Sequence, residues 1–255
     1  MRTSSMILSI FTGLFLLAVI ACQSKSKELT AQEIVDRAIE VVGGATIANS
    51  SIAFKFRDYH YRAKRQGGEY QYERCTDENC EERRDILDNA GFERFEQLQA
   101  VPLPDSLQSK YGNSVNSVHY FSVLPYGLNA AAVNKTLKGK TTVHGKEYYL
   151  IGVTFAREGG GDDYDDEYVY WISTEDFTVD YLAYNYQVNG GGTRFREAYN
   201  PRVIEGIRFV DYRNYKPEAT FPPLESLDSL YETDQLELLS KIELENISVA
   251  PCPAC

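Results

Sequence analysis

Residues 168–183, YVYWISTEDFTVDYLA, decide the fold. The two ends of this stretch are rich in aromatic and β-branched residues, which is the composition of β-strands. Four polar residues, Ser173–Asp176, separate the two ends. Because so short a link brings two strands together in opposite directions, the stretch predicts an antiparallel hairpin.

Further strands with the same period of two lie on both sides of this hairpin. After Asp58 the alternation changes sense, which suggests a β-bulge. A hairpin also follows from the pairing of residues 70–73 with 84–87. About ten or eleven strands are expected in all. Besides the four strands of these two hairpins, they lie at residues 52–56, 59–62, 149–155, 193–199, 207–215 and 236–249.

Helices are expected at three places. Thr30-Ala31-Gln32-Glu33 is a capping box, and it predicts a helix of about twelve residues that ends at Gly43-Gly44. Residues 102–128 have roughly helical spacing between prolines and predict a helical insertion on the sheet. A short helix is expected at residues 224–232.

Strand order and twist together predict the fold class. The strands follow one another in one antiparallel run, which is typical of an α+β domain. Twist accumulates at roughly 20–25° per strand pair, so a sheet this wide must curl, split or close. We therefore expect a single curled antiparallel sheet, an unclosed β-barrel, with helices covering its concave face.

The first 22 residues have the features of an export signal. Arg2 precedes an uncharged apolar run, Ile7 to Ile20, and Ala21-Cys22 follows it. This end resembles the lipobox of bacterial lipoproteins. The resemblance implies that residues 1–21 are removed and that Cys22 carries the acyl chains (palmitate among them), which anchor the protein to a membrane. An ordinary secretory signal with a cysteine there by chance is the alternative.

The resemblance also sets the expected location and domain boundaries. Gln23 follows Cys22 where an aspartate would suggest retention at the inner membrane, so the expected location is the outer membrane, facing the periplasm. Residues 22–29 are expected to be a tether, 30–250 one domain and 251–255 a tail that contains cysteines. With 37 acidic against 26 basic residues and a net charge of -11, a nucleic-acid partner is not expected.

Four cysteines remain besides Cys22: Cys75, Cys80, Cys252 and Cys255. An oxidising compartment favours disulfides, and four cysteines allow three pairings. We favour the local pair Cys75–Cys80. A four-cysteine zinc site is an alternative, although its two halves are far apart in the sequence. The motif Cys252-Pro-Ala-Cys255 would need a following helix for redox chemistry, so it is interpreted as an inert local bridge or tail.

Aromatic residues suggest the kind of ligand. The chain has 19 Tyr, 12 Phe and one Trp, which suit a concave apolar surface that helices fill only in part. Strand parity alone selects a ligand-binding face composed of Phe54, Phe56, Tyr70, Tyr72, Tyr149, Ile151, Val169, Trp171, Tyr181 and Phe195.

Charged residues give weaker indications of a site. A cluster of five acids could hold Ca²⁺, although its spacing does not match an EF-hand, so neither a metal nor a cofactor is expected. The five acids of this cluster are Asp162, Asp163, Asp165, Asp166 and Glu167. His119 is expected to be a hydrogen-bonded core histidine. Arg194, Arg196, Glu197, Asp211 and Arg213 are expected to form cross-strand ion pairs or, at a cavity mouth, to meet a phosphate or carboxylate head group.

Several stretches resemble known proteins. The architecture is similar to that of the lipoprotein carrier and receptor proteins of the Lol system, and this implies an unclosed β-barrel with helices covering an apolar cavity. More narrowly, the chain resembles a family of envelope lipoproteins of unknown function, for which no catalytic residues are implied. The stretches that carry this resemblance are residues 38–44, AIEVVGG; 113–121, NSVNSVHYF; 124–128, LPYGL; and 195–202, FREAYNPR.

Three hypotheses about function follow. The first is a membrane-anchored lipoprotein that binds or passes a lipid, acyl chain or other apolar ligand in the cell envelope. The second is a structural lipoprotein with a filled cavity that docks an envelope protein partner. The third is a hydrolase or isomerase that acts inside the cavity. No G-x-S-x-G or zinc-protease motif is present, so the chain is not expected to be an enzyme.

Overall fold

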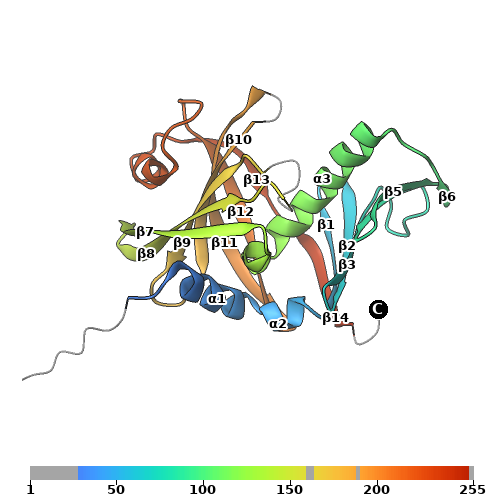
Figure 1. Cartoon of the computed structure of the whole chain (residues 1–255), viewed down its shortest axis with the longest axis horizontal. Helices are drawn as coiled ribbons and strands as arrows, with labels where there is room; N and C mark the ends of the chain where they lie inside the picture. The colour runs from blue at the N-terminus through green and yellow to red at the C-terminus, as the bar shows by residue number, and fades with distance from the viewer. Residues whose placement is uncertain (1–27, 159–163, 188–189, 253–255) are drawn as a thin grey trace, which may run out of the picture.

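The computed structural model describes residues 28–158, 164–187 and 190–252. The predictions for residues 1–21, Cys22, Asp162, Asp163 and Cys255 lie outside these ranges. The described strands form two seven-stranded antiparallel sheets, here called sheet A and sheet B, which lie side by side in Figure 1. The prediction of a single sheet of ten or eleven strands is therefore wrong, whereas the antiparallel, unclosed arrangement is confirmed.

Sheet A has the strand order β14-β1-β2-β3-β4-β5-β6. Its strands are β1 (Ser50–Phe56), β2 (Tyr59–Gln66), β3 (Glu69–Cys75), β4 (Arg83–Asp88), β5 (Gly91–Glu96), β6 (Gln99–Ala100) and β14 (Glu245–Pro251). The change in alternation near Asp58 is the two-residue turn of a hairpin, with Phe56 paired to Tyr59 and Arg57 at a φ of 54°. The predicted bulge is thus wrong, because a tight turn also reverses the sense of the pattern.

Sheet B has the strand order β13-β12-β11-β10-β9-β8-β7. Its strands are β7 (Val133–Val143), β8 (Lys146–Phe155), β9 (Glu167–Ser173), β10 (Val179–Tyr186), β11 (Gly192–Ile204), β12 (Ile207–Lys216) and β13 (Glu237–Ile242). The predicted hairpin of residues 168–183 is confirmed as β9 and β10. Only Glu243 and Leu244 separate β13 from β14, so one nearly continuous segment belongs to both sheets.

The helices are α1 (Ala31–Val42), α2 (Gly44–Ile47), α3 (Asp105–Ser122) and α4 (Leu227–Glu232), with 3-10 turns η1 (Tyr126–Asn129) and η3 (Leu224–Ser226). The capping box at Thr30 and Glu33 is present, and Gly43 ends α1 in the left-handed conformation at a φ of 92°. These confirm the prediction for α1. The helices α3 and α4 confirm the two other predicted helical segments.

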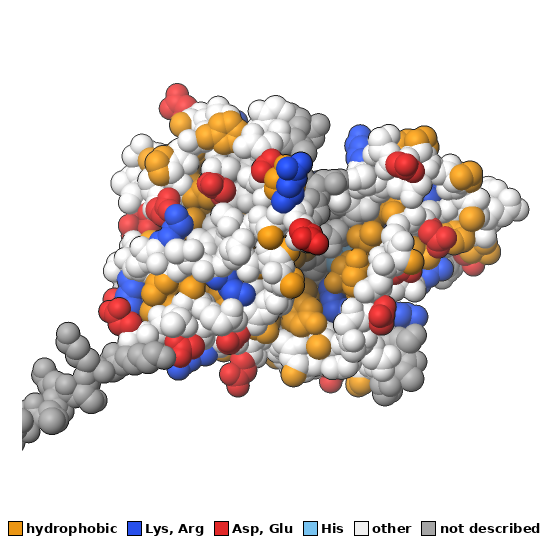
Figure 2. Space-filling model, viewed as in Figure 1, with side chains coloured by type: hydrophobic (Ala, Val, Ile, Leu, Met, Phe, Trp, Pro, Cys, Tyr) orange, Lys and Arg blue, Asp and Glu red, His pale blue; other side chains and the backbone are white. Residues whose placement is uncertain are grey.

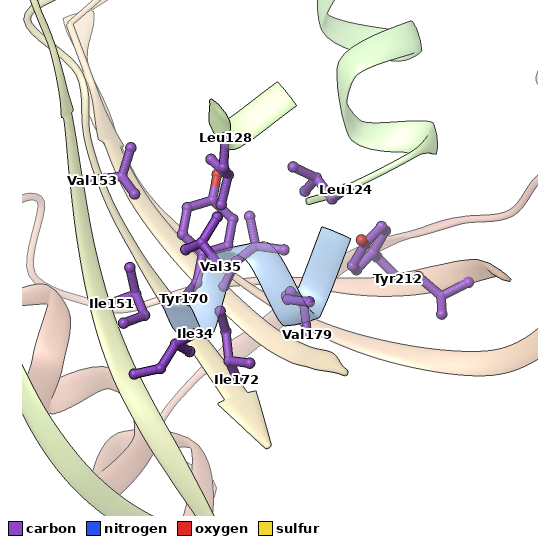
Figure 3. Close-up of a cluster of buried hydrophobic side chains, with 13 residues drawn as sticks. Ile34, Val35, Leu124, Leu128, Ile151, Val153, Tyr170, Ile172, Val179 and Tyr212 are labelled. Carbon is purple, nitrogen blue, oxygen red and sulfur yellow. The ribbon is translucent and has the colours of Figure 1, made fainter. Parts of the chain in front are cut away.

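The two faces of sheet B have separate cores. On the face that α1 contacts, here called the α1 face, Ile34 and Val35 pack with Ile151, Tyr170 and Ile172 (Figure 3). On the opposite face, here called the α4 face, η3 and α4 bring Leu224 and Leu227 against the sheet. Because both faces are covered, five consecutive residues of β9, 169–173, are buried.

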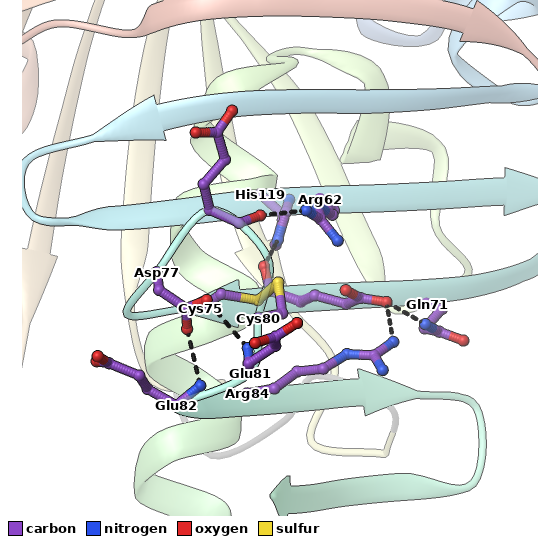
Figure 4. Close-up of a disulfide and its surroundings, with 11 residues drawn as sticks. Arg62, Gln71, Cys75, Asp77, Cys80, Glu81, Glu82, Arg84 and His119 are labelled. Atoms are coloured by element: carbon purple, nitrogen blue, oxygen red, sulfur yellow. Dashed lines mark hydrogen bonds and ion pairs between the residues drawn. A yellow bond between two sulfur atoms is a disulfide. The ribbon is translucent and has the colours of Figure 1, made fainter. Parts of the chain in front are cut away.

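Sheet A packs against α3. Asp85 is buried in this interface between two arginines, and the Arg94 guanidinium stacks 4.0 Å from the ring centroid of Tyr111 in α3. At the end of β3, Cys75 and Cys80 form a disulfide (Figure 4), which confirms the favoured local pair. The Asp77 carboxylate accepts hydrogen bonds from the two backbone N–H groups that follow the disulfide loop, at 3.0 and 2.9 Å.

Candidate functional site: a cavity between the two sheets

A cavity of about 490 Å³ lies between sheet B, the end of β1 and the C-terminal half of α3. Figure 2 shows the hollow between the two sheets from one side, with hydrophobic side chains inside it. The floor consists of residues from β9 to β13, and α3 supplies one wall. The residues that line the cavity are Phe56, Arg57, Ser117, Val118, Phe121, Ser122, Asp166, Tyr168, Tyr184, Tyr186, Arg194, Arg196, Val210, Tyr212, Asn214, Ser240, Ile242 and Leu244.

The position of α1 explains why the cavity forms where it does. Helix α1 buries Ile34, Val35 and Ala38 against the α1 face, near the Ile151 and Ile172 end of the strands. Strand register places Tyr168 and Tyr184 next to each other on this same face. No residue of α1 lines the cavity, so the helix covers only part of the face and the cavity occupies the remainder.

The cavity floor is aromatic. The rings of Tyr168 and Tyr184 stack with their centroids 5.1 Å apart, and Phe121 of α3 lies 5.8 Å from Tyr184. Burial raises the pKa of Tyr212 to about 12 and that of Tyr168 well above its ordinary value. These phenols therefore stay neutral at physiological pH and present apolar ring surface with a few hydroxyl groups.

Arg196 is the buried charge of the site. Its side chain emerges from the middle of β11 and is 9% exposed. Its Nη2 donates to the Tyr184 hydroxyl at 2.8 Å, and its guanidinium carbon lies 4.0 Å from the ring centroid of Phe121. Within the described ranges, its buried Nε has no hydrogen-bond partner.

The structure separates the ten residues that parity assigned to one binding face. Only Phe56 lines the cavity, while Tyr149 and Ile151 lie on the α1 face beside it. The prediction of a shared face is wrong for four residues, which belong to the α4 face: Val169, Trp171, Tyr181 and Phe195. The other three, Phe54, Tyr70 and Tyr72, belong to sheet A.

Register is the physical reason for this error. Ile151 of β8 pairs with Tyr170 of β9, so Val169 and Trp171 point away from Ile151. Trp171 is fully buried and its Nε1 donates to a carboxylate oxygen of Asp228 in α4, at 3.2 Å. It is thus a core residue of the opposite face. In contrast, Tyr168, Tyr184 and Arg196 line the cavity, and of these only Arg196 was singled out from the sequence.

The charged residues of β11 and β12 were predicted either to form cross-strand ion pairs or to lie at a cavity, and the structure shows both arrangements. Glu197 pairs with Arg213 at 2.9 Å, which confirms a cross-strand ion pair. Asp211 pairs with Arg202 at 2.8 Å rather than with the expected arginines. Arg194 and Arg196 instead line the cavity, which matches the alternative prediction for this group.

His119 of α3 is a core histidine, as predicted. It is fully buried, and its ring stacks 4.7 Å from that of Tyr72. Its Nε2 lies 3.1 Å from the backbone oxygen of Glu73, and because a carbonyl only accepts, this nitrogen carries the proton. Burial is the largest cause that lowers the pKa of His119 to about 3. The ring is therefore neutral at physiological pH.

One group of potential metal ligands occurs within the described ranges: Glu73, Cys75 and Cys80. Both sulfur atoms of this group are already joined in the disulfide, so they cannot act as thiolate ligands. Within the same ranges, no helix combines the length and the apolar composition that crossing a bilayer requires.

The fold and cavity define a class: an open, two-sheet, antiparallel β-protein with an internal aromatic cavity. The chain belongs to a family of unknown function, DUF6503, whose model matches residues 9–244. This confirms the prediction, from stretches such as 38–44 and 195–202, of membership in a family without an assigned function. No curated protein matches the chain.

Solved structures similar to the chain include three from bacteria. The first is a LolA superfamily protein from Nitrosomonas europaea, with 12% identity, a TM-score of 0.47, and coverage of 88% of this chain and 92% of that one. The second is a DUF1329 family protein from Desulfovibrio piger, with 9% identity, a TM-score of 0.48, and coverage of 86% and 93%. The third, described as a putative outer membrane lipoprotein-sorting protein domain, comes from Vibrio parahaemolyticus, with 6% identity, a TM-score of 0.45, and coverage of 86% and 93%.

Proposed function

We propose that this chain is a lipid-anchored envelope protein that binds the apolar chain of a lipid or a similar ligand between its two sheets. The cavity on the α1 face is the observation that carries this proposal. Its volume of about 490 Å³ lies within the range of small-molecule sites, and its floor is aromatic and aliphatic. Each ligand methylene buried there would contribute ~0.8 kcal/mol to binding.

The proposed anchor is Cys22, acylated at the outer membrane and facing the periplasm. Its support is the sequence around Ala21-Cys22 and the seven-residue polar spacer before α1. Helices α1 and α3 would then close the concave side of the sheets, and the cavity is the part they leave open. Binding a ligand there needs no catalytic residue, so the proposal is for a binding protein and not for an enzyme.

A cavity-filling variant tests the proposal. Ser117 and the adjacent Asn116 of α3 are both exposed, but only Ser117 lines the cavity. We expect Ser117→Trp to weaken binding of a fluorescent fatty acid by about tenfold or more, because an indole would occupy the space of the ligand. The matched control, Asn116→Trp, should bind like the wild type. Equal affinity of both variants and the wild type would contradict the proposed site.

A further inference from the structure

We propose that the ligand of this cavity is an anionic amphiphile whose carboxylate or phosphate binds Arg196. This inference rests on the proposed function and specifies the chemical class of the ligand. Arg196 lies in the middle of the cavity floor, within the row Leu182, Arg196, Asn214 and Ser240 that runs across four neighbouring strands.

The hydrogen bonds of Arg196 are incomplete. One nitrogen, Nη2, donates to Tyr184, while the buried Nε has no partner among the described residues. A buried donor without a partner is costly, and a buried charge is usually paired with an opposite charge. The ring of Phe121 stacks against the guanidinium but provides no hydrogen-bond acceptor in its plane. An anionic oxygen would supply both the acceptor and the charge.

A second polar atom beside Arg196 is also incomplete. Asn214 pairs with Arg196 across β11 and β12, and its Oδ1 is buried without a hydrogen-bond partner within the described ranges. Both side chains line the same cavity. Because an amide oxygen only accepts, Asn214 Oδ1 would be satisfied by a hydroxyl of the ligand beside its anionic group, while the surrounding tyrosines and Val210 suit its apolar part.

The charges of the cavity have the opposite sign to the protein as a whole. The chain has a net charge of -11, yet the cavity lining contains Arg57, Arg194 and Arg196 against a single carboxylate, that of Asp166. Arg194 stacks over Tyr186 and donates to the Thr193 backbone oxygen, which places a second guanidinium at the same wall. A low-dielectric cavity with excess positive charge favours an anionic ligand.

Four probes with matched structure test this inference by displacement of a fluorescent fatty acid from the full chain. Dodecanoate and dodecyl phosphate have an anionic head, dodecanol has the same chain without charge, and inorganic phosphate has the charge without the chain. We expect both anionic amphiphiles to bind about tenfold more tightly than dodecanol, and phosphate alone to displace nothing. Raising the salt concentration should reduce the preference for the anions.

Variants identify the residue responsible. Arg196→Gln should reduce the preference for the anionic probes to about twofold while dodecanol still binds, and Arg196→Lys should retain part of it. Arg213→Gln, on the α4 face, is the matched control and should behave like the wild type. If Arg196→Gln does not fold, the probe preference and salt dependence of the wild type decide.

The outcomes separate this inference from the proposed function. Equal binding of dodecanol and the anions would overturn the anionic head group and leave the apolar cavity intact. Tight binding of inorganic phosphate alone would also overturn it, because the ligand would then need no chain. Loss of binding of all probes, dodecanol included, in a folded Arg196→Gln variant would also overturn it, because Arg196 would then maintain the shape of the cavity rather than bind an anionic head group. Failure of all four probes with the wild type would contradict the proposed function itself.

Discussion

The Asp211 carboxylate of β12 accepts a hydrogen bond from the backbone N–H of Leu244 at 3.0 Å, at the point where sheet B gives way to sheet A. Arg202 completes the junction, since its Nη2 donates to Asp211 Oδ1 and to the Leu244 backbone oxygen, both at 2.8 Å. Asp211 is 3% exposed. The two sheets are thus joined by a hydrogen-bonded ion pair with a buried carboxylate, beside the cavity residue Leu244.

Removing the Asp211 carboxylate should destabilise the protein. Asp211→Ala leaves Arg202 unpaired and the Leu244 N–H without its acceptor, so the free energy of unfolding should fall by about 3–5 kcal/mol in urea titrations. The control is Glu237→Ala, which breaks an exposed pair with Lys216 and should cost no more than about 1 kcal/mol. Equal effects of the two substitutions would contradict the importance of this junction.

His119 should make stability depend on pH. Its pKa is about 3 in the folded protein against an ordinary value of 6.5, so the unfolded chain binds an extra proton between these values. The contribution is fully present above pH 6.5 and declines as pH falls, by about 1.4 kcal/mol per unit, until pH nears 3. Urea titrations from pH 7 to 5 should show a smaller slope for His119→Gln. The same slope in both proteins would mean that His119 is protonated when folded.

Trp171 should affect stability and not binding. Trp171→Phe removes a hydrogen bond to the buried Asp228 carboxylate, so we expect a loss of roughly 1–3 kcal/mol in the free energy of unfolding. Because the indole lies on the α4 face, the affinity for dodecanoate should be unchanged. A large loss of affinity without a loss of stability would place the ligand on that face instead.

The Cys75–Cys80 disulfide should stabilise the protein modestly. It closes a short loop, with five residues of sequence separation, and the chain-entropy relation gives about 2 kcal/mol for so short a loop. The double substitution of both cysteines by serine should therefore lower the unfolding free energy by that amount, measured in urea. No residue from 75 to 80 lines the cavity, so fatty-acid affinity should remain. A change in affinity would connect the loop to the site.

Local signals in the sequence predicted local structure well. The capping box at Thr30 and Glu33 depends only on neighbouring residues, and α1 forms as expected. Strands at or next to the sheet edges were missed: β7 is an edge strand with exposed residues at most positions and several lysines, and β5, next to the edge strand β6, is only partly buried. Since only one side of such strands contacts the core, their apolar period is weak.

The sequence could not predict which side chains of neighbouring strands lie on the same face of the sheet, because this depends on the register of strand pairing. A shift of one residue between β8 and β9 would exchange Tyr170 for Trp171 on the α1 face. Hairpin geometry sets this register, and the residues of the loop between β8 and β9 do not reveal it. Arg196 was identified as a candidate because it is one of five charged residues on two adjacent predicted strands, where the alternatives were cross-strand ion pairs and a head-group site.

Native mass spectrometry of the full chain, purified from membranes of a Gram-negative host, tests the central claim most directly. A ligand held in the cavity should appear as one additional lipid mass per chain, separate from the mass of any covalent acyl chains. That adduct should be present in Asn116→Trp and absent or strongly reduced in Ser117→Trp. The account is contradicted if the wild type shows no adduct, even after incubation with a lipid extract, or if Ser117→Trp retains it in full.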